Sequence, residues 1–352
     1  MKSVRTVILS LVVMALALVC VLLLSQELAA APVLPADMIL ASPEPMADGA
    51  TSGAWSSDWI TFPVGTCQTL NHNLGGDPDD YGVEVWFLDT DGSEGMHRKY
   101  YGGSEIAGRW RGANWQHLES NTIEVCRGSN DYDANRLRVR VWELTENPDF
   151  DSGWRDIGPG VANSLTINHN LGITPTELAV TLWFSGTEKG IHHYAYGGLY
   201  DGGADKLQGA YWQRLTENTV EVSRMPSDEY VEQVRVIVTC PDPPNYDSLV
   251  AEGSWRVRNV LAAEVFSHTL NWNPNLLMVR TECQSPTFGI HQRDAGLTFY
   301  GGPGWQGAYI HNLTSDSVAV SWGLWDTACD EVRVRIWRRG TRVYLPFVVK
   351  GP

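Results

Sequence analysis

The stretch INHNLGITPTELAVTLWF at residues 167–184 decides the fold class, because it joins a turn to a strand and occurs in related form three times. Asn170 and Gly172 suit the left-handed backbone of tight turns, and Pro175 follows them. Over residues 178–184 large apolar side chains alternate with other residues, which is the period of a β-strand. The segment therefore predicts a turn that leads into a strand.

The same landmarks recur in three copies along the 352 residues. Each copy has a His-x-Leu segment and a proline, then Gly-x-His, Tyr-Gly-Gly and a closing strand that contains arginine. In copy order, these landmarks are His72, His169 and His268; Pro78, Pro175 and Pro274; His97, His192 and His291; Tyr101, Tyr196 and Tyr300; Arg138, Arg235 and Arg333. The period of roughly 100 residues is the size of a domain, whereas solenoid repeats have about 20–50.

Short alternating segments separated by Gly, Asn, Asp and Pro predict strands throughout each copy. We therefore expect an all-β protein of three tandem antiparallel β-sandwich repeats, at residues 54–144, 150–240 and 245–338. In this interpretation one face of each strand is buried, and side chains such as Glu84 and Trp86 point outward.

The N-terminal residues 1–31 have the order of an export signal: Lys2 and Arg5, an apolar run over 7–24, and small residues after it. The run is also long enough to span a bilayer, so a cleaved signal peptide and a retained membrane anchor both remain open. Either places the repeats outside the cytoplasm, secreted or on the extracellular face of the cell envelope. Residues 32–53 are expected to be a flexible linker, and 339–352 a C-terminal tail.

The net charge and the cysteines limit the classes of partner and predict the disulfides. Lys and Arg number 26 against 41 Asp and Glu, a net charge of −15, which argues against a nucleic acid partner. Export permits disulfides, and small residues replace Cys67 and Cys126 in the other copies, so we predict that these two positions face each other. The predicted disulfides are Cys67–Cys126 and Cys283–Cys329, with Cys240 left over.

The opening Ser152-Gly153-Trp154, the His-Asn-Leu-Gly turn with its proline, and the closing Arg-Val-Arg-Val-Trp strand resemble H-type lectin domains. Similar units occur in exported bacterial proteins and phage tail fibres. The resemblance implies six-stranded sandwiches that form trimers and bind sugars such as N-acetylgalactosamine between subunits. Three copies on one chain then form either an intramolecular pseudo-trimer or extended beads.

Histidine, aromatic and glycine residues cluster in the first two copies, and this combination fits sugar recognition. The candidate ligand-binding residues are His97, Tyr101, Trp115, His192, Tyr196 and Trp212. The alternative is that these rings fill the core. His72, His169 and His268 are interpreted as turn histidines whose ring nitrogens satisfy loop backbone groups.

Asp89, Asp91 and Glu94 resemble part of a calcium loop, with a hairpin turn as the alternative. No other cofactor is expected. Catalytic motifs such as GxSxG or HExxH do not occur. We therefore expect a non-enzymatic, lectin-like binding protein for glycans or an extracellular surface. The alternatives are a structural or adhesive surface protein and, more remotely, a degenerate glycoside hydrolase.

Overall fold

A computed structural model describes most of residues 54–338. The described ranges are 54–105, 110–144, 148–158, 163–197, 199–201, 206–241, 243–252, 254–258, 262–292, 298–299, 305–322, 326 and 328–338. The expected signal or anchor (1–31), linker (32–53) and tail (339–352) lie outside them. No helix in these ranges is long and apolar enough to cross a membrane.

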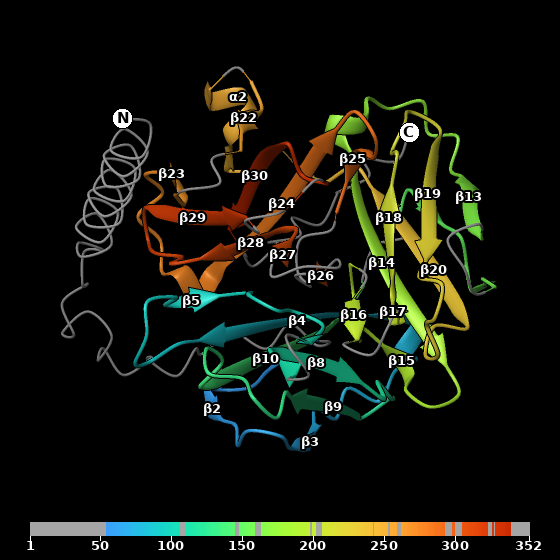
Figure 1. Cartoon of the computed structure of the whole chain (residues 1–352), viewed down its shortest axis with the longest axis vertical. Coiled ribbons are helices and arrows are strands. Elements are labelled where there is room, and N and C mark those ends of the chain that lie inside the picture. Colours follow the sequence, from blue (N-terminus) through green and yellow to red (C-terminus); the bar gives the residue numbers. More distant parts are fainter. Residues whose placement is uncertain are drawn as a thin grey trace, which may run out of the picture. The chain divides into compact units, whose positions relative to one another are not determined.

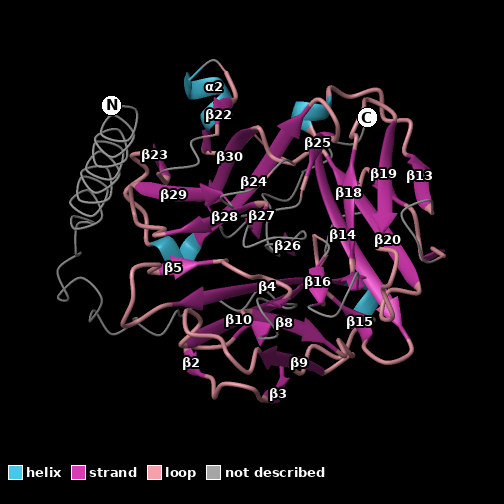
Figure 2. Cartoon of the chain, viewed as in Figure 1, coloured by secondary structure: helices cyan, strands magenta, loops and turns pink. Residues whose placement is uncertain are grey.

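The described chain is almost entirely β-structure, as Figure 2 shows. The first repeat contains β1 (Ala54–Ser56), β2 (Ile60–Thr61), β3 (Cys67–Asn71), η2 (Pro78–Asp80), β4 (Tyr81–Leu88), β5 (Met96–His97), β6 (Ser104–Glu105), β7 (Trp110–Arg111), β8 (Ala113–Gln116), β9 (Thr122–Arg127) and β10 (Arg136–Glu143). The second contains β11 (Phe150–Asp151), β12 (Arg155–Asp156), β13 (Ser164–Asn168), η3 (Pro175–Glu177), β14 (Ala179–Gly186), β15 (Gly190–His192), β16 (Leu199–Asp201), β17 (Lys206–Gln208), β18 (Ala210–Gln213), β19 (Thr219–Arg224) and β20 (Gln233–Thr239).

The third repeat follows the same order and adds one short helix. It contains β21 (Tyr246–Asp247), α2 (Ser248–Glu252), β22 (Arg256–Val257), β23 (Glu264–Ser267), η4 (Pro274–Leu276), β24 (Leu277–Ser285), β25 (Gly289–His291), β26 (Thr298–Phe299), β27 (Trp305–Gln306), β28 (Ala308–His311), β29 (Ser317–Trp322) and β30 (Glu331–Arg338).

Each repeat supplies a five-stranded and a three-stranded antiparallel sheet, together with a two-stranded hairpin. In the first repeat the larger sheet has the order β1-β10-β4-β5, with β2 also paired to β10, and the smaller sheet has the order β3-β9-β8. The three five-stranded and three three-stranded sheets are arranged as a six-bladed β-propeller. The prediction of an all-β chain is thus right, but the prediction of three tandem β-sandwich repeats is wrong.

The sandwich prediction fails because the strand faces assigned to solvent are buried. On β4, Glu84 is 5% exposed and Trp86 is 1% exposed. Arg138 and Arg140 on β10 are buried too. Trp86 and Met96 pack with core residues of the third repeat, such as Phe266. The opposite face of β4 is buried as well: Val85 and Phe87 belong to a core cluster, and Phe87 packs against His97 and Tyr101 of the same repeat. Each larger sheet is therefore covered on both faces, as a propeller blade is.

The proline turns and the closing arginines form one kind of joint between repeats. Each proline begins a short 3-10 turn, η2, η3 or η4. The carbonyl of the residue after the proline accepts a bond from an arginine of another repeat. The donor and acceptor pairs are Arg235 with Asp79, Arg333 with Thr176, and Arg140 with Asn275. The joints therefore run from the second repeat to the first, the third to the second, and the first to the third.

The Gly-x-His landmarks form the second kind of joint. The backbone N–H of His117 donates to Lys189 at 2.9 Å, that of Arg214 donates to Phe288 at 2.8 Å, and that of Asn312 donates to Glu94 at 2.8 Å. Strands β6, β16 and β26, one from each repeat, contact one another in pairs. Figure 1 shows β16 and β26 in the middle of the view. The proline turns and the segments at the Gly-x-His landmarks therefore join the repeats into a closed ring, although in the first repeat the arginine of the proline joint is Arg140 and not the recurring Arg138.

Candidate functional site

An aromatic pair marks the junction between the first two repeats. Trp110 comes from β7 and Tyr194 comes from the segment after β15, with ring centroids 5.6 Å apart and planes inclined by 32°. Both side chains are partly exposed. Ala195 N–H donates to Gly102 at 2.9 Å and His193 N–H donates to Trp115 at 3.0 Å, so backbone bonds fix the second repeat beside the first. The aromatic pair therefore lies on an ordered part of the junction.

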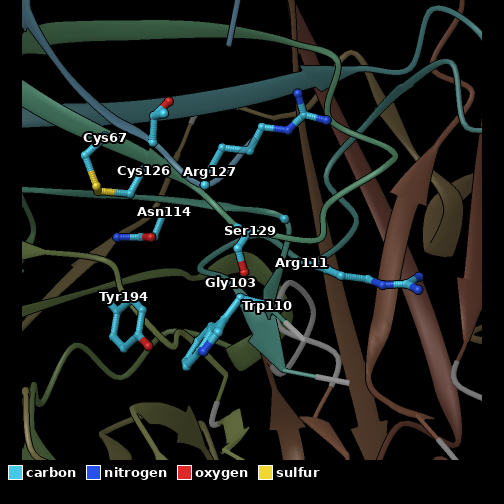
Figure 3. A pocket seen from close by; sticks show the side chains of 13 residues that line it. Cys67, Gly103, Trp110, Arg111, Asn114, Cys126, Arg127, Ser129 and Tyr194 are labelled. Carbon is cyan, nitrogen blue, oxygen red and sulfur yellow. A yellow bond between two sulfur atoms is a disulfide. The ribbon is translucent and has the colours of Figure 1, made fainter. Parts of the chain in front are cut away.

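These rings open onto a cleft of about 230 Å³. Its other walls come from β7 and from the β3-β9-β8 sheet. The lining residues are Gly65, Thr66, Cys67, Gly103, Trp110, Arg111, Gly112, Asn114, Cys126, Arg127, Gly128, Ser129 and Tyr194. Figure 3 shows Trp110, Tyr194 and Asn114 grouped near the disulfide. Asn114 is only 6% exposed, so its amide is held in place by packing.

The two arginines that line the cleft point away from this group in Figure 3. Arg127 is held by Asp131, through Nε to Oδ2 at 2.8 Å, and by the carbonyl of Phe62 at 2.6 Å. The guanidinium of Arg111 lies 5.1 Å from the ring centroid of Tyr132. The groups that face the cleft are therefore aromatic rings, an amide and hydroxyls rather than charges.

The six residues predicted to bind sugar have a different place in the structure. His97 and His192 have no exposed surface, and the others are at most 3% exposed. They contact one another and the core: Trp115 Nε1 donates to the Tyr101 hydroxyl at 3.0 Å, for example, and Phe184 packs against Tyr196. A sugar cannot stack on rings that are closed off in this way. The structure therefore gives Tyr101, Trp115, Tyr196 and Trp212 a packing role, which is the alternative interpretation of these rings.

His97 and His192 hold loops in place. Nε2 of His97 donates to the carbonyl of Asp133 at 2.8 Å, and Nδ1 accepts from the N–H of Lys99 at 3.1 Å. His192 makes the same pair of bonds, with Tyr230 at 3.1 Å and Tyr194 at 3.1 Å. Burial lowers the pKa of His97 to about 4 and that of His192 to about 3. Both rings are therefore neutral at physiological pH.

The turn histidines have the local role that was expected of them. In each copy Nδ1 accepts from the N–H two residues on, at 3.4 Å, for His72, His169 and His268. The intervening residue has a left-handed backbone, with φ of 53° at Asn73 and Asn170. These histidines stabilise the turns that precede the proline joints.

The acidic residues proposed as a calcium loop do not converge on a cation site. Asp89 accepts backbone bonds from Gly92 at 2.9 Å and from Glu94 at 3.2 Å, which closes a tight turn. Glu94 is turned toward Lys99, with Oε1 2.6 Å from Nζ. Asp91 is exposed. The hairpin-turn alternative therefore describes this segment.

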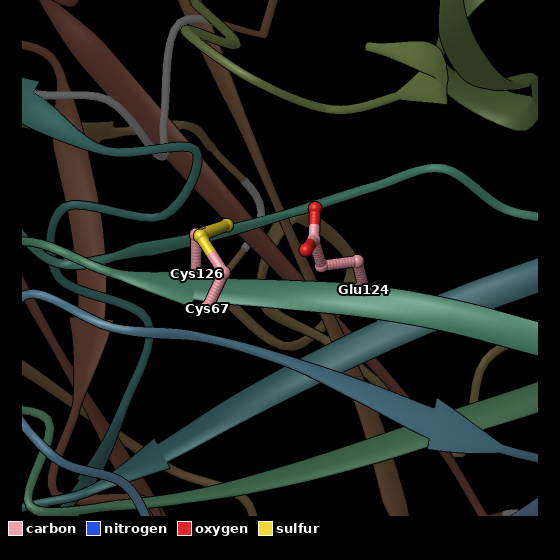
Figure 4. Close-up of side chains that lie close together, drawn as sticks. All are labelled: Cys67, Glu124 and Cys126. Carbon is pink, nitrogen blue, oxygen red and sulfur yellow. A yellow bond between two sulfur atoms is a disulfide. The ribbon is translucent and has the colours of Figure 1, made fainter.

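Both predicted disulfides, Cys67–Cys126 and Cys283–Cys329, are present, and Cys240 is free and exposed. Cys67 and Cys126 are directly opposed on β3 and β9, and Ser164 and Ser223 occupy the same register in the second repeat. In the described part of the chain, Cys67, Glu124 and Cys126 lie close enough together to resemble a metal site (Figure 4). The two sulfurs are bonded to each other, so they carry no thiolate charge for a metal.

Sequence reasoning missed Trp110, Tyr194 and Asn114, because no spacing along the chain brings a residue of the second repeat beside the first. It also missed a contact between Ser321, His311 and Glu94 at the junction between the third and first repeats. Comparison with protein-family models, with curated proteins and with solved structures found no match to this chain.

Proposed function

We propose that the protein is an exported binding protein that takes a neutral sugar ring into the cleft beside Trp110 and Tyr194. The observation that carries this proposal is the partly exposed aromatic pair, with the amide side chain of Asn114 in the lining of the same cleft. An aromatic face packs against the apolar face of a sugar, while an amide both donates to and accepts from sugar hydroxyls. The two disulfides fit an oxidising environment, which supports export.

The size and charge of the cleft narrow the ligand class. Pockets for drug-sized ligands have about 300–1,000 Å³, so a cleft of about 230 Å³ suits one sugar unit, with the rest of a glycan in solvent. Arg111 and Arg127 point away in Figure 3, and Arg127 is already bound to Asp131. A neutral sugar is therefore favoured over a sialylated or sulfated one.

A glycan array followed by titration calorimetry tests this proposal on the full chain. Trp110→Ala should weaken binding by about 2 kcal/mol, about thirty-fold in Kd, because it removes the stacking surface. Trp110→Phe keeps an aromatic face and should retain most of the affinity. Asn114→Ala should weaken binding and broaden the choice among sugars. If no neutral glycan binds, or if Trp110→Ala binds as well as the wild type, the cleft is not a sugar site.

A second candidate is an adhesive surface protein without a small-molecule site. Three valines near the start of the third repeat favour it, since Val250 is 81%, Val257 is 66% and Val265 is 54% exposed. Large exposed apolar patches mark protein interaction surfaces, and exposed valines add apolar area to such a patch. Replacing all three with Ser should then abolish adhesion of the chain to cells or matrix and leave glycan binding unchanged.

A further inference from the structure

A groove in the second repeat lies between the edges of two sheets. Among the described strands, β11 pairs only with β20 and β13 pairs only with β19, so each is the edge strand of its sheet. The groove beside them has a volume of about 290 Å³, and its lining residues are Phe150, Asp151, Ser152, Arg155, Leu165, Thr166, Ile167 and Asn168. An edge strand presents backbone N–H and C=O groups that can pair with an added strand.

The third repeat fills the equivalent place with its own side chains. Arg256 on β22 reaches β23, where its Nη1 donates to the carbonyl of Val265 at 2.9 Å. Two carboxylates hold the guanidinium there, because Nε donates to Glu252 at 3.0 Å and Nη1 donates to Glu264 at 3.2 Å. The guanidinium also lies 4.3 Å from the ring centroid of Phe266. In this repeat the chain therefore supplies both a donor for the sheet edge and the carboxylates that hold that donor.

The second repeat keeps the arginine but not its carboxylates. Arg155 occupies the register of Arg256, because each lies opposite the valine that precedes the recurring arginine of the closing strand. Leu165 stands where the third repeat has Glu264, and residues 152–154 form no counterpart of α2. Arg155 is exposed and its Nε donates to a backbone carbonyl, whereas no carboxylate of the described chain pairs with its guanidinium. The groove therefore contains a cation that lacks the partners of its counterpart.

The acids beside this cation are engaged with other groups. Asp151 lines the groove, but both of its oxygens accept from Arg235. Asp156 follows Arg155 in the chain and accepts from Gln233 at 2.8 Å. Partly exposed apolar side chains, Phe150 among them, complete the lining. The groove therefore favours a ligand that carries both a carboxylate and apolar groups.

The register also shows which backbone groups of β13 face the groove. Thr166 lies at the position of Val265, whose carbonyl points to the outer edge of its sheet and accepts from Arg256. In an antiparallel pair the N–H and C=O of one residue point to the same side. Both groups of Thr166 therefore point away from β19, toward the groove that this residue lines.

We propose that this groove binds an extended peptide with an acidic side chain, which adds to β13 as a further strand. The peptide backbone exchanges hydrogen bonds with Thr166, and main-chain bonds of this kind supply the affinity of added strands. A Glu or Asp side chain of the peptide pairs with Arg155, in the place that Glu252 and Glu264 take beside Arg256 in the third repeat. The partner is therefore a protein with an exposed, acidic and partly apolar segment.

Fluorescence polarisation on the full chain tests this proposal with a library of labelled hexapeptides. Each peptide is acetylated and amidated, consists of alternating Val and Thr, and carries either Glu or Gln at one position. Glu peptides should bind, and their Gln counterparts should bind about tenfold more weakly because the charged hydrogen bond is lost. Methylation of every second backbone nitrogen should abolish binding in one frame and not in the other, because one side of the added strand pairs with β13.

Replacement of the arginine tests the ion pair from the side of the protein. Arg155→Gln should weaken binding of the Glu peptide about tenfold, and Arg155→Glu should reverse the preference toward a Lys peptide, which a purely structural role would not produce. Arg256→Gln is the matched control, because that arginine has the same register in the third repeat, and it should leave peptide binding unchanged. Circular dichroism shows whether each variant is folded.

Four results would overturn the proposal. The first is that the folded wild-type chain binds no Glu peptide, and the second is that Arg155→Gln binds the Glu peptide as tightly as the wild type. The third is that N-acetylglutamate amide binds as tightly as the peptide, which would show a carboxylate site without an added strand. The fourth is self-association by light scattering that Arg155→Gln abolishes, which would make a second copy the occupant. None of these results bears on the cleft beside Trp110, whose lining residues are different.

Discussion

Mild acid should destabilise this protein because His97 and His192 are fully buried and neutral. Burial lowers the pKa of His97 to about 4 and that of His192 to about 3, whereas a histidine in the unfolded chain has a pKa of about 6.5. As the pH falls below 6.5, the unfolded chain binds protons that the folded chain does not. The free energy of unfolding therefore falls with pH, down to about pH 4 for His97 and about pH 3 for His192.

The size of the effect at pH 5.5 depends on the unfolded state. There the unfolded histidine is about tenfold more often protonated than neutral, while both folded rings remain neutral, so each contributes about 1.3 kcal/mol. His97 and His192 together should remove about 2.6 kcal/mol between pH 7.5 and 5.5. This loss is a large fraction of a typical stability of about 5–15 kcal/mol.

Urea unfolding followed by tryptophan fluorescence at pH 7.5 and 5.5 measures this loss. The double variant His97→Asn with His192→Asn keeps an acceptor near the place of Nδ1 and does not titrate. Its stability should depend less on pH than that of the wild type, by about 2.6 kcal/mol over this range. An equal loss in both proteins would refute the assignment of the effect to these two rings.

Three further changes have expected outcomes. Replacing Cys67 and Cys126 together by Ser should lower the free energy of unfolding by about 2–4 kcal/mol, measured by urea titration under non-reducing conditions, since it frees a long loop in the unfolded chain. Gly209→Ala should lower the melting temperature far more than Gly172→Ala. Both glycines have positive φ, but only at residue 209 would the added Cβ lie 1.8 Å from a backbone oxygen. Similar melting temperatures for the two variants would contradict this prediction. Arg235→Ala should cost about 2 kcal/mol, since it breaks a joint between repeats and leaves Asp151 without its ion pair, and a change below about 0.5 kcal/mol by the same melts would count against the joint.

Local features were predictable because they depend on neighbours in the sequence. The alternation over residues 178–184 predicted a strand, and β14 covers most of that range. The small residues that replace Cys67 and Cys126 in the other copies predicted that these positions face each other, and they are paired across β3 and β9. The turn role of His72 followed from the Asn and Gly beside it, and Asn73 has the left-handed backbone that such a turn needs.

The packing of the sheets was not predictable in the same way. An alternating strand reveals two faces, but it does not tell whether the polar face meets water or another sheet. Arg235 and Arg333 alternate with the apolar residues of their strands, yet both are buried, and each donates to a carbonyl in a proline turn of another repeat as well as to an aspartate of its own repeat. These carbonyl acceptors lie about 156 residues away in the chain, so no local sequence pattern predicts the contacts.

The sequence by itself determined the three copies, their strands and turns, and both disulfides, since each of these depends on residue type at short or repeated spacing. Tertiary structure alone decided that the sheets close into a six-bladed ring and which side chains meet at its junctions. Trp110 meets Tyr194, and His311 meets Glu94, across boundaries between repeats. The physical reason is that the backbone bonds of each joint place one repeat against the next, and only then do these side chains become neighbours.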